Sequence, residues 1–211
     1  MAPKVKCHEL IEAIDSCSNW PGRRSNLDNL EKCIEKHEER GWDKNGDVPD
    51  AKPANQYPLI HWAAVLGKYM ALKWLLKPEN GFSFDVKSSE KGETALHTAL
   101  ELPFLQPKHR KASPELIRKF SKTVALLKNL LPIKDEENGN IPLHTAAKLL
   151  VNERSSAFFL GCFEVIIKRC KKMGNSVLDG VLNSTNNFGE TALHILARGS
   201  EKKVEDRKSV V

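Results

Sequence analysis

The sequence predicts an all-α protein made of stacked helix-pair repeats. Three observations support this fold class. A short phrase containing Leu-His recurs along the chain, and a second amphipathic segment follows most copies. In addition, 40% of the 211 residues are hydrophobic, which is enough to build a core. One helix pair cannot bury its own apolar face, so consecutive pairs must pack on each other.

The recurring phrase reads GETALHTA at residues 92–99, GNIPLHTAA at residues 139–147 and GETALHILA at residues 189–197. A looser copy, QYPLIHWAA, occupies residues 56–64. The glycine suits a turn that a side chain would resist, and Thr94 and Thr191 are placed to cap the helix that follows. The small alanines let neighbouring helices approach closely. Each phrase therefore predicts a turn followed by an inner helix.

The segments that follow the first three phrases along the chain are predicted to be outer helices. Their apolar residues recur at helical spacing in Tyr69 to Leu76, Ser121 to Leu131 and Cys162 to Cys170. One unit is thus a turn, an inner helix, a loop and an outer helix.

The phrases resemble the G-x-T-P-L-H-x-A-A signature of the ankyrin-repeat family. The resemblance covers residues 53–211 and implies a solenoid of about four to five units of about 33 residues each. The histidines here are spaced more widely than in that family. We therefore expect long insertions between inner and outer helices, at Leu102 to Lys119 and Leu150 to Ala157. Pro58 and Ile141 replace the signature threonine, and Ile141 loses the hydroxyl cap.

The two ends of the chain depart from the phrase. Residues 1–50 predict two helices, Val5 to Cys17 and Leu27 to Arg40, which we interpret as a divergent capping repeat. An unrelated helical hairpin is the alternative. Residues 53–211 form the array, and Val204 to Val211 resembles the start of a second helix in an incomplete last repeat. This pattern favours a piece of a longer protein.

Cysteine usage favours an intracellular chain, nuclear or cytoplasmic, and the family resemblance favours the nucleus. The formal net charge is +6, which suits acidic partners but falls short of a dedicated nucleic-acid binder. The five cysteines (Cys7, Cys17, Cys33, Cys162 and Cys170) are odd in number and lack C-x-x-C spacing, so a disulfide framework is not expected. We find neither a signal peptide nor a membrane span, and we expect a monomer.

The four phrase histidines, His61, His97, His144 and His194, invite a metal or catalytic interpretation. They hold one equivalent position per unit, so stacking separates them by about 10 Å. Zinc ligands must lie about 2 Å from one ion. The family resemblance implies instead that each histidine hydrogen-bonds within its turn. No phosphate loop or nucleophile elbow is present, so we expect no enzyme activity, cofactor or metal.

The resemblance implies a protein–protein interaction scaffold that binds a peptide or protein on its concave side, where turn tips and inner helices meet. The side chains expected there are Tyr57, Trp62, Glu93, Thr98, Asn138, Asn140, Thr145, Asn187, Phe188 and Glu190. Trp62 is either an anchor for a partner or a core residue. The mixed polarity suits a segment with Lys or Arg, and a nuclear or chromatin-linked role is one such case.

Two basic clusters suggest an alternative function. They comprise Lys108, Arg110, Lys111, Arg118, Lys119 and Lys122, and then Lys168, Arg169, Lys171 and Lys172. They predict either solvated helix faces or a contact surface for an acidic segment or for nucleic acid. Few aromatic residues interleave with them, which disfavours single-stranded nucleic acid. A purely structural role inside a larger chain is the third hypothesis.

Overall fold

The computed structural model describes residues 8–17, 25–48, 57–101, 114–152 and 156–199. These residues are helical apart from turns and two isolated β-bridges, Asp47 with Pro58 and Lys87 with Thr94. The all-α prediction is therefore confirmed.

Two helices precede the repeats, α1 (His8–Ser16) and α2 (Ser25–Glu38). They correspond to the two helices predicted from the sequence, but α1 ends one residue earlier, and α2 begins and ends two residues earlier than predicted. Leu10 and Ile14 of α1 and Leu30 of α2 are fully buried, because the apolar residues recur on one face of each helix. Helix α1 also contacts α3, so the pair adjoins the first repeat.

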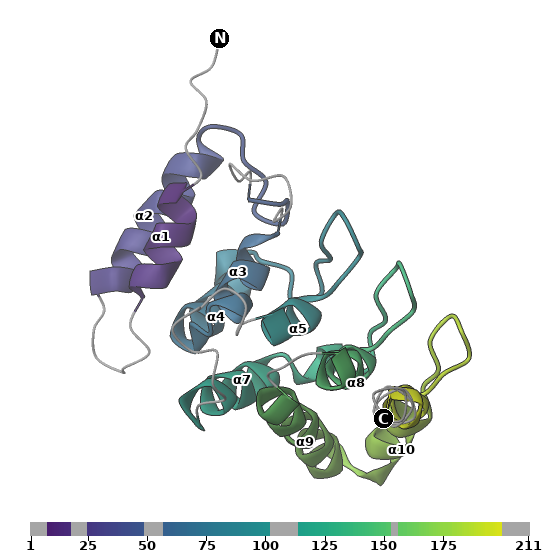
Figure 1. Ribbon diagram of the computed structural model, residues 1–211. Helices are drawn as coiled ribbons and strands as arrows, with labels where there is room; N and C mark the ends of the chain where they lie inside the picture. The colour runs from purple at the N-terminus through teal and green to yellow at the C-terminus, as the bar shows by residue number, and fades with distance from the viewer. Residues whose placement is uncertain (1–7, 18–24, 49–56, 102–113, 153–155, 200–211) are drawn as a thin grey trace, which may run out of the picture.

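The inner helices form one row and the outer helices form a second row beside it (Figure 1). The inner row contains α3 (Leu59–Val65), α5 (Ala95–Thr98) continued by η3 (Ala99–Glu101), α8 (Pro142–Asn152) and a helical segment at residues 192–199. The outer row contains α4 (Tyr69–Leu75), α7 (Pro114–Leu126) and α9 (Ser156–Met173). The short helices η2 (Pro78–Asn80) and η5 (Lys128–Leu130) follow α4 and α7.

An extended hairpin precedes each later inner helix, and all of these hairpins project from the same side of the array (Figure 1). We call them finger 1 (residues 86–94), finger 2 (residues 133–141) and finger 3 (residues 184–191). This regular side-by-side arrangement is that of a solenoid, in which each unit contacts mainly its neighbours.

Aromatic residues from the outer helices fill the core of the second half. The ring of Phe120 in α7 lies 6.4 Å from that of Phe158 in α9, and Phe158 lies 5.3 Å from Phe159, both edge-to-face. All three side chains are essentially inaccessible to solvent. Edge-to-face contacts between buried rings stabilise this interface beyond simple burial of area.

The two insertions predicted between inner and outer helices are too long, because parts of both are helical in the structure. Helix α7 begins at Pro114, because proline suits the first helical turn, so residues 114–119 are helical rather than part of a loop. Helices α8 and α9 together include residues 150–152 and 156–157, which leaves at most residues 153–155 between them. Much of the extra length instead forms a long α9 and an additional helix, α10 (Asn175–Asn183), which packs on α9. Residues 102–113 and Val204 to Val211 lie outside the described residues.

Candidate interaction surfaces

The phrase histidines hold their own turn and also reach the next finger. The backbone N–H of Thr94 donates to Nδ1 of His97 at 3.2 Å, so this nitrogen carries no proton. The other ring nitrogen, Nε2, therefore bears the proton and donates to the carbonyl oxygen of Asn140 at 2.8 Å. The same pattern recurs at His144. Its Nδ1 accepts from the N–H of Ile141 at 3.2 Å, and its Nε2 donates to the backbone carbonyl oxygen of Glu190 at 2.9 Å.

Thr94 and His97 form a reciprocal capping box at the start of α5, as the phrase predicts. Thr191 caps the last inner helix in a similar way, because its hydroxyl accepts from the N–H of His194 at 3.4 Å. Ile141 lacks the hydroxyl but keeps the backbone half of the motif. The family resemblance predicts the hydrogen bond within the turn, but it does not predict the bond from Nε2 to the following finger.

His61 differs because Pro58 has no N–H to donate. Its Nε2 still lies 2.9 Å from the carbonyl oxygen of Val86 in finger 1, while Nδ1 lies 3.5 Å from the hydroxyl of Thr98. Burial lowers the pKa of His61 and of His97 to about 4, and it lowers the pKa of His144 in the same direction. These imidazoles are thus neutral structural groups, each bonded to a different carbonyl. No group of three or more potential metal ligands occurs among the described residues.

The fingers are joined directly to one another by their backbones. The N–H of Glu136 in finger 2 donates to the carbonyl oxygen of Lys91 in finger 1 at 3.1 Å. The N–H of Asn187 in finger 3 donates to the carbonyl oxygen of Asn138 in finger 2 at 2.9 Å. Together with the histidine bonds, these contacts hold the three fingers as one continuous, preformed edge.

Asn186 holds the tip of finger 3. Its side-chain oxygen accepts from the N–H groups of Phe188 and Glu190, each at 3.0 Å, and its amide nitrogen lies 3.3 Å from the side-chain oxygen of Asn140. Gly189 completes the turn with a φ of 73°. This network presents Phe188 to solvent, where 69% of the residue is exposed.

Four of the ten predicted partner-binding side chains are buried, so the expectation that a partner can reach them is wrong. Relative exposure is 7% for Tyr57, 6% for Trp62, 0% for Thr98 and 2% for Asn140. Trp62 lies in α3 and Thr98 in α5, and every residue of these two inner helices is buried. Tyr57 precedes α3 and stacks on His61 with ring centres 5.9 Å apart, and the side-chain oxygen of Asn140 accepts from Asn186. Trp62 is therefore a core residue, packed edge-to-face on Tyr57 at 6.0 Å.

The other six predicted side chains remain wholly or partly accessible, and most lie in the second half of the array. They are Glu93, Asn138, Thr145, Asn187, Phe188 and Glu190. The carboxylate of Glu190 also pairs with Arg198. Sequence reasoning misses Leu193, which is exposed on the helix that follows finger 3. It also misses Asn186, whose role depends on the length of its turn. The N–H of Asn186 donates to the carbonyl oxygen of Glu190, four residues on, whereas in finger 2 the N–H of Asp135 donates to that of Asn140, five residues on.

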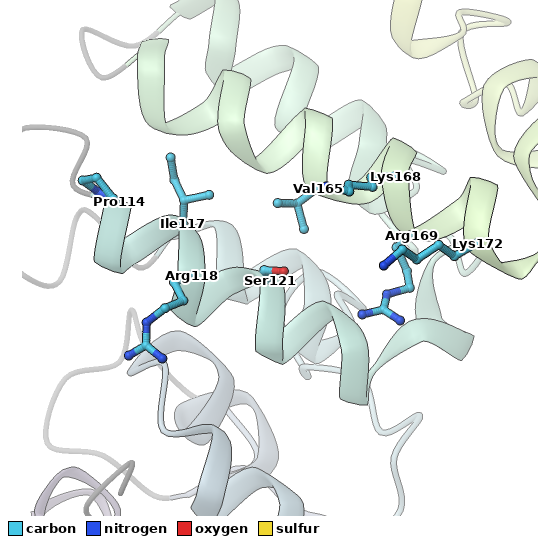
Figure 2. Close-up of a pocket in the computed structure, with 8 residues that line it drawn as sticks. All are labelled: Pro114, Ile117, Arg118, Ser121, Val165, Lys168, Arg169 and Lys172. Atoms are coloured by element: carbon cyan, nitrogen blue, oxygen red, sulfur yellow. The ribbon is translucent and has the colours of Figure 1, made fainter.

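Part of both basic clusters meets in a groove of about 390 Å³ between α7 and α9 (Figure 2). Helix α7 contributes Pro114, Ile117, Arg118 and Ser121, and α9 contributes Val165, Lys168, Arg169 and Lys172. The remaining cluster members do not line it: Lys119, Lys122 and Lys171 lie elsewhere on the same helices, and Lys108, Arg110 and Lys111 lie outside the described residues. Lys122 instead sits 3.9 Å from the centre of the Tyr69 ring on α4.

Comparison with known proteins agrees with this geometry. Residues 60–101 match the family model for ankyrin repeats in many copies. A solved structure with a similar fold is the ankyrin-repeat fragment of Swi6 from S. cerevisiae, with a TM-score of 0.57 and 16% identity over 97% of this chain and 80% of that chain. No curated protein sequence matches the chain. No described helix is long and apolar enough to cross a membrane. Residues 60–101 therefore resemble ankyrin repeats in sequence, and the described residues have the all-α solenoid fold of an ankyrin-repeat array.

Proposed function

We propose that the chain is a non-enzymatic scaffold that binds a protein segment along fingers 2 and 3 and the adjoining inner helices. The exposure of Phe188 at the tip of finger 3 carries this proposal. Phe188 is apolar, 69% of the residue is exposed, and it therefore does not serve the core. The tip that carries it is held in place by hydrogen bonds to Asn186. Large aromatic side chains on rigid surfaces commonly dominate the binding energy of interfaces.

Preformed geometry favours such binding, because little conformational entropy is lost when a partner docks. The tip of finger 3 is fixed by Asn186, and finger 3 is fixed to finger 2 through the Asn187 to Asn138 backbone bond. Asn138 and Asn187 offer partly or fully exposed amide groups on fingers 2 and 3, and Glu137 adds an exposed carboxylate. This mixture suits an extended segment that carries an apolar residue next to Lys or Arg.

Replacing Phe188 with alanine should weaken binding without weakening the fold. We expect peptides selected from a displayed library by the full chain to bind Phe188→Ala about 30-fold less tightly, since truncating such an aromatic group costs about 2 kcal/mol. Fluorescence anisotropy with the selected peptides measures the loss.

Phe84→Ala is the matched control, because Phe84 is also an exposed phenylalanine, at 46%, but lies outside fingers 2 and 3. It should leave the affinities unchanged. Selected peptides that bind wild type and Phe188→Ala equally well would assign the binding surface to another face.

We also propose that residues 1–50 act as the N-terminal cap of the array. Lys68 at the start of the first outer helix pairs with Asp15 at 3.1 Å, and the side chain of Asn45 accepts from the N–H of Ser83 at 2.7 Å. Both contacts join the N-terminal region to the first repeat. A terminal unit is required to shield the apolar face that the first repeat would otherwise expose.

A further inference from the structure

The groove between α7 and α9 lies among the outer helices, away from the fingers (Figures 1 and 2). The side chains that line it sit at positions 114, 117, 118 and 121 of α7 and 165, 168, 169 and 172 of α9. Each set follows the i, i+3, i+4, i+7 spacing that places residues on one helical face. Two matching stripes therefore face one another over about 10 Å.

Apolar side chains form part of both walls. Ile117 and Val165 come from opposite helices and are only partly buried. Gly161 of α9 lets the two helices pack closely beside these side chains, because it has no side chain. A Cβ atom at this position would lie only 2.6 Å from Cδ1 of Ile117. Ile117 thus contacts α9 at Gly161, while the space beyond it remains open and partly apolar.

Four cations surround these apolar side chains, and no described residue that lines the groove is acidic. Arg118 and Arg169 lie toward opposite ends, with Ser121 between them (Figure 2). Lys168, Arg169 and Lys172 have no ion-pair partner among the described residues. Arg118 bonds Glu115 through two contacts of 2.7 Å, but this pair is half exposed and contributes little, so it can exchange with a ligand.

This combination distinguishes between classes of ligand. A phosphate backbone would be attracted by the cations but would gain nothing from Ile117 and Val165, and no aromatic side chain lines the groove to stack on bases. An acidic peptide gains from both, because its carboxylates can pair with Arg and Lys while an apolar side chain is removed from water. The length admits about three extended residues or two helical turns.

We propose that this groove binds an acidic, amphipathic peptide segment of a partner protein. Its carboxylates pair with Arg169, Lys168 and Lys172 on α9 and compete with Glu115 for Arg118. Its apolar residue rests between Ile117 and Val165. The site is separate from the surface proposed around Phe188, so one chain can hold two partners, or two parts of one partner, of opposite charge.

The test uses fluorescence anisotropy with the full chain and labelled probes of stated composition. These probes are a peptide that alternates Glu and Leu, a poly-glutamate peptide of equal charge, and a duplex DNA oligonucleotide. We expect the Glu/Leu peptide to bind most tightly. The double variant Lys168→Glu/Arg169→Glu should weaken its binding at least about tenfold, because two attractive charges become repulsive.

The matched control is Lys32→Glu/Lys73→Glu, which makes the same change of net charge at exposed lysines of α2 and α4. It should change the affinity less than about twofold, since only the long-range field is altered. Val165→Thr keeps the side-chain shape and should cost about threefold for the Glu/Leu peptide but nothing for poly-glutamate. Phe188→Ala should have no effect, which separates this proposal from the function proposed above.

Three results would overturn the proposal. The first is absence of Glu/Leu peptide binding to the wild-type chain. The second is an equal loss of affinity in the groove variant and the control variant, which would indicate non-specific attraction to a basic protein. The third is tighter binding of duplex DNA with a steep dependence on salt, which would identify a nucleic-acid surface. Circular dichroism of each variant establishes that it is folded.

Discussion

Acidification from about pH 7 to about pH 4.5 is expected to remove roughly 5 kcal/mol of the free energy of unfolding, which is comparable to the whole stability of many domains. The cause lies in His61 and His97, whose burial lowers their pKa to about 4 from an ordinary value of 6.5. Between these two values the unfolded chain binds more protons than the folded chain, so stability is complete above about pH 6.5 and falls as the pH drops toward about 4. Each histidine contributes roughly 3 kcal/mol, because a tenfold difference in proton affinity equals about 1.4 kcal/mol.

Urea unfolding at a series of pH values measures this effect through the extrapolated free energy of unfolding. His97→Gln serves as the comparison, because it removes one of the two titrating imidazoles. The variant should be less stable at neutral pH, yet its stability should depend less steeply on pH. A wild-type stability that is flat from about pH 6.5 to about pH 4.5 would contradict neutral, buried histidines.

Gly139→Ala is expected to destabilise the protein by roughly 2–4 kcal/mol, from a left-handed backbone and a steric clash combined. The φ of Gly139 is 66°, which L side chains rarely adopt. A Cβ atom there would also clash with Oδ1 of Asn187 and would lie 3.1 Å from the backbone nitrogen of that residue. The clash falls on the junction between fingers 2 and 3, so the Asn187 side chain would have to turn away and the finger backbones would have to shift apart slightly.

Gly189→Ala isolates the two causes. Gly189 has a similar φ of 73°, but a Cβ atom at this position would have no neighbouring atom within 4 Å among the described residues. We expect this variant to lose only about 1 kcal/mol, the cost of the left-handed conformation. Thermal or urea unfolding of both variants gives the difference. Equal losses at the two positions would mean that the fingers are not closely stacked at Gly139.

Local sequence patterns are sufficient for the repeat itself. The phrase around His97 predicts the turn, the threonine cap and the start of the inner helix, because these depend on residues three or four positions apart. The same reasoning fails at Pro114, where it predicts a loop although proline is common in the first turn of a helix. It also misses α10, which lies between the third outer helix and finger 3.

Helix pairs that stack are predictable from the amino-acid sequence, because apolar residues recur at helical spacing and one pair cannot bury them. Which polar and aromatic positions reach solvent depends on how the repeats pack together. Trp62 and Thr98 are buried because every residue of α3 and α5 is covered, whereas Phe188 is exposed at the tip of finger 3. Arg118 and Arg169 are far apart in the chain and share one groove because α7 and α9 pack together. Burial and convergence of this kind depend on contacts between repeats, which periodicity within one repeat does not encode.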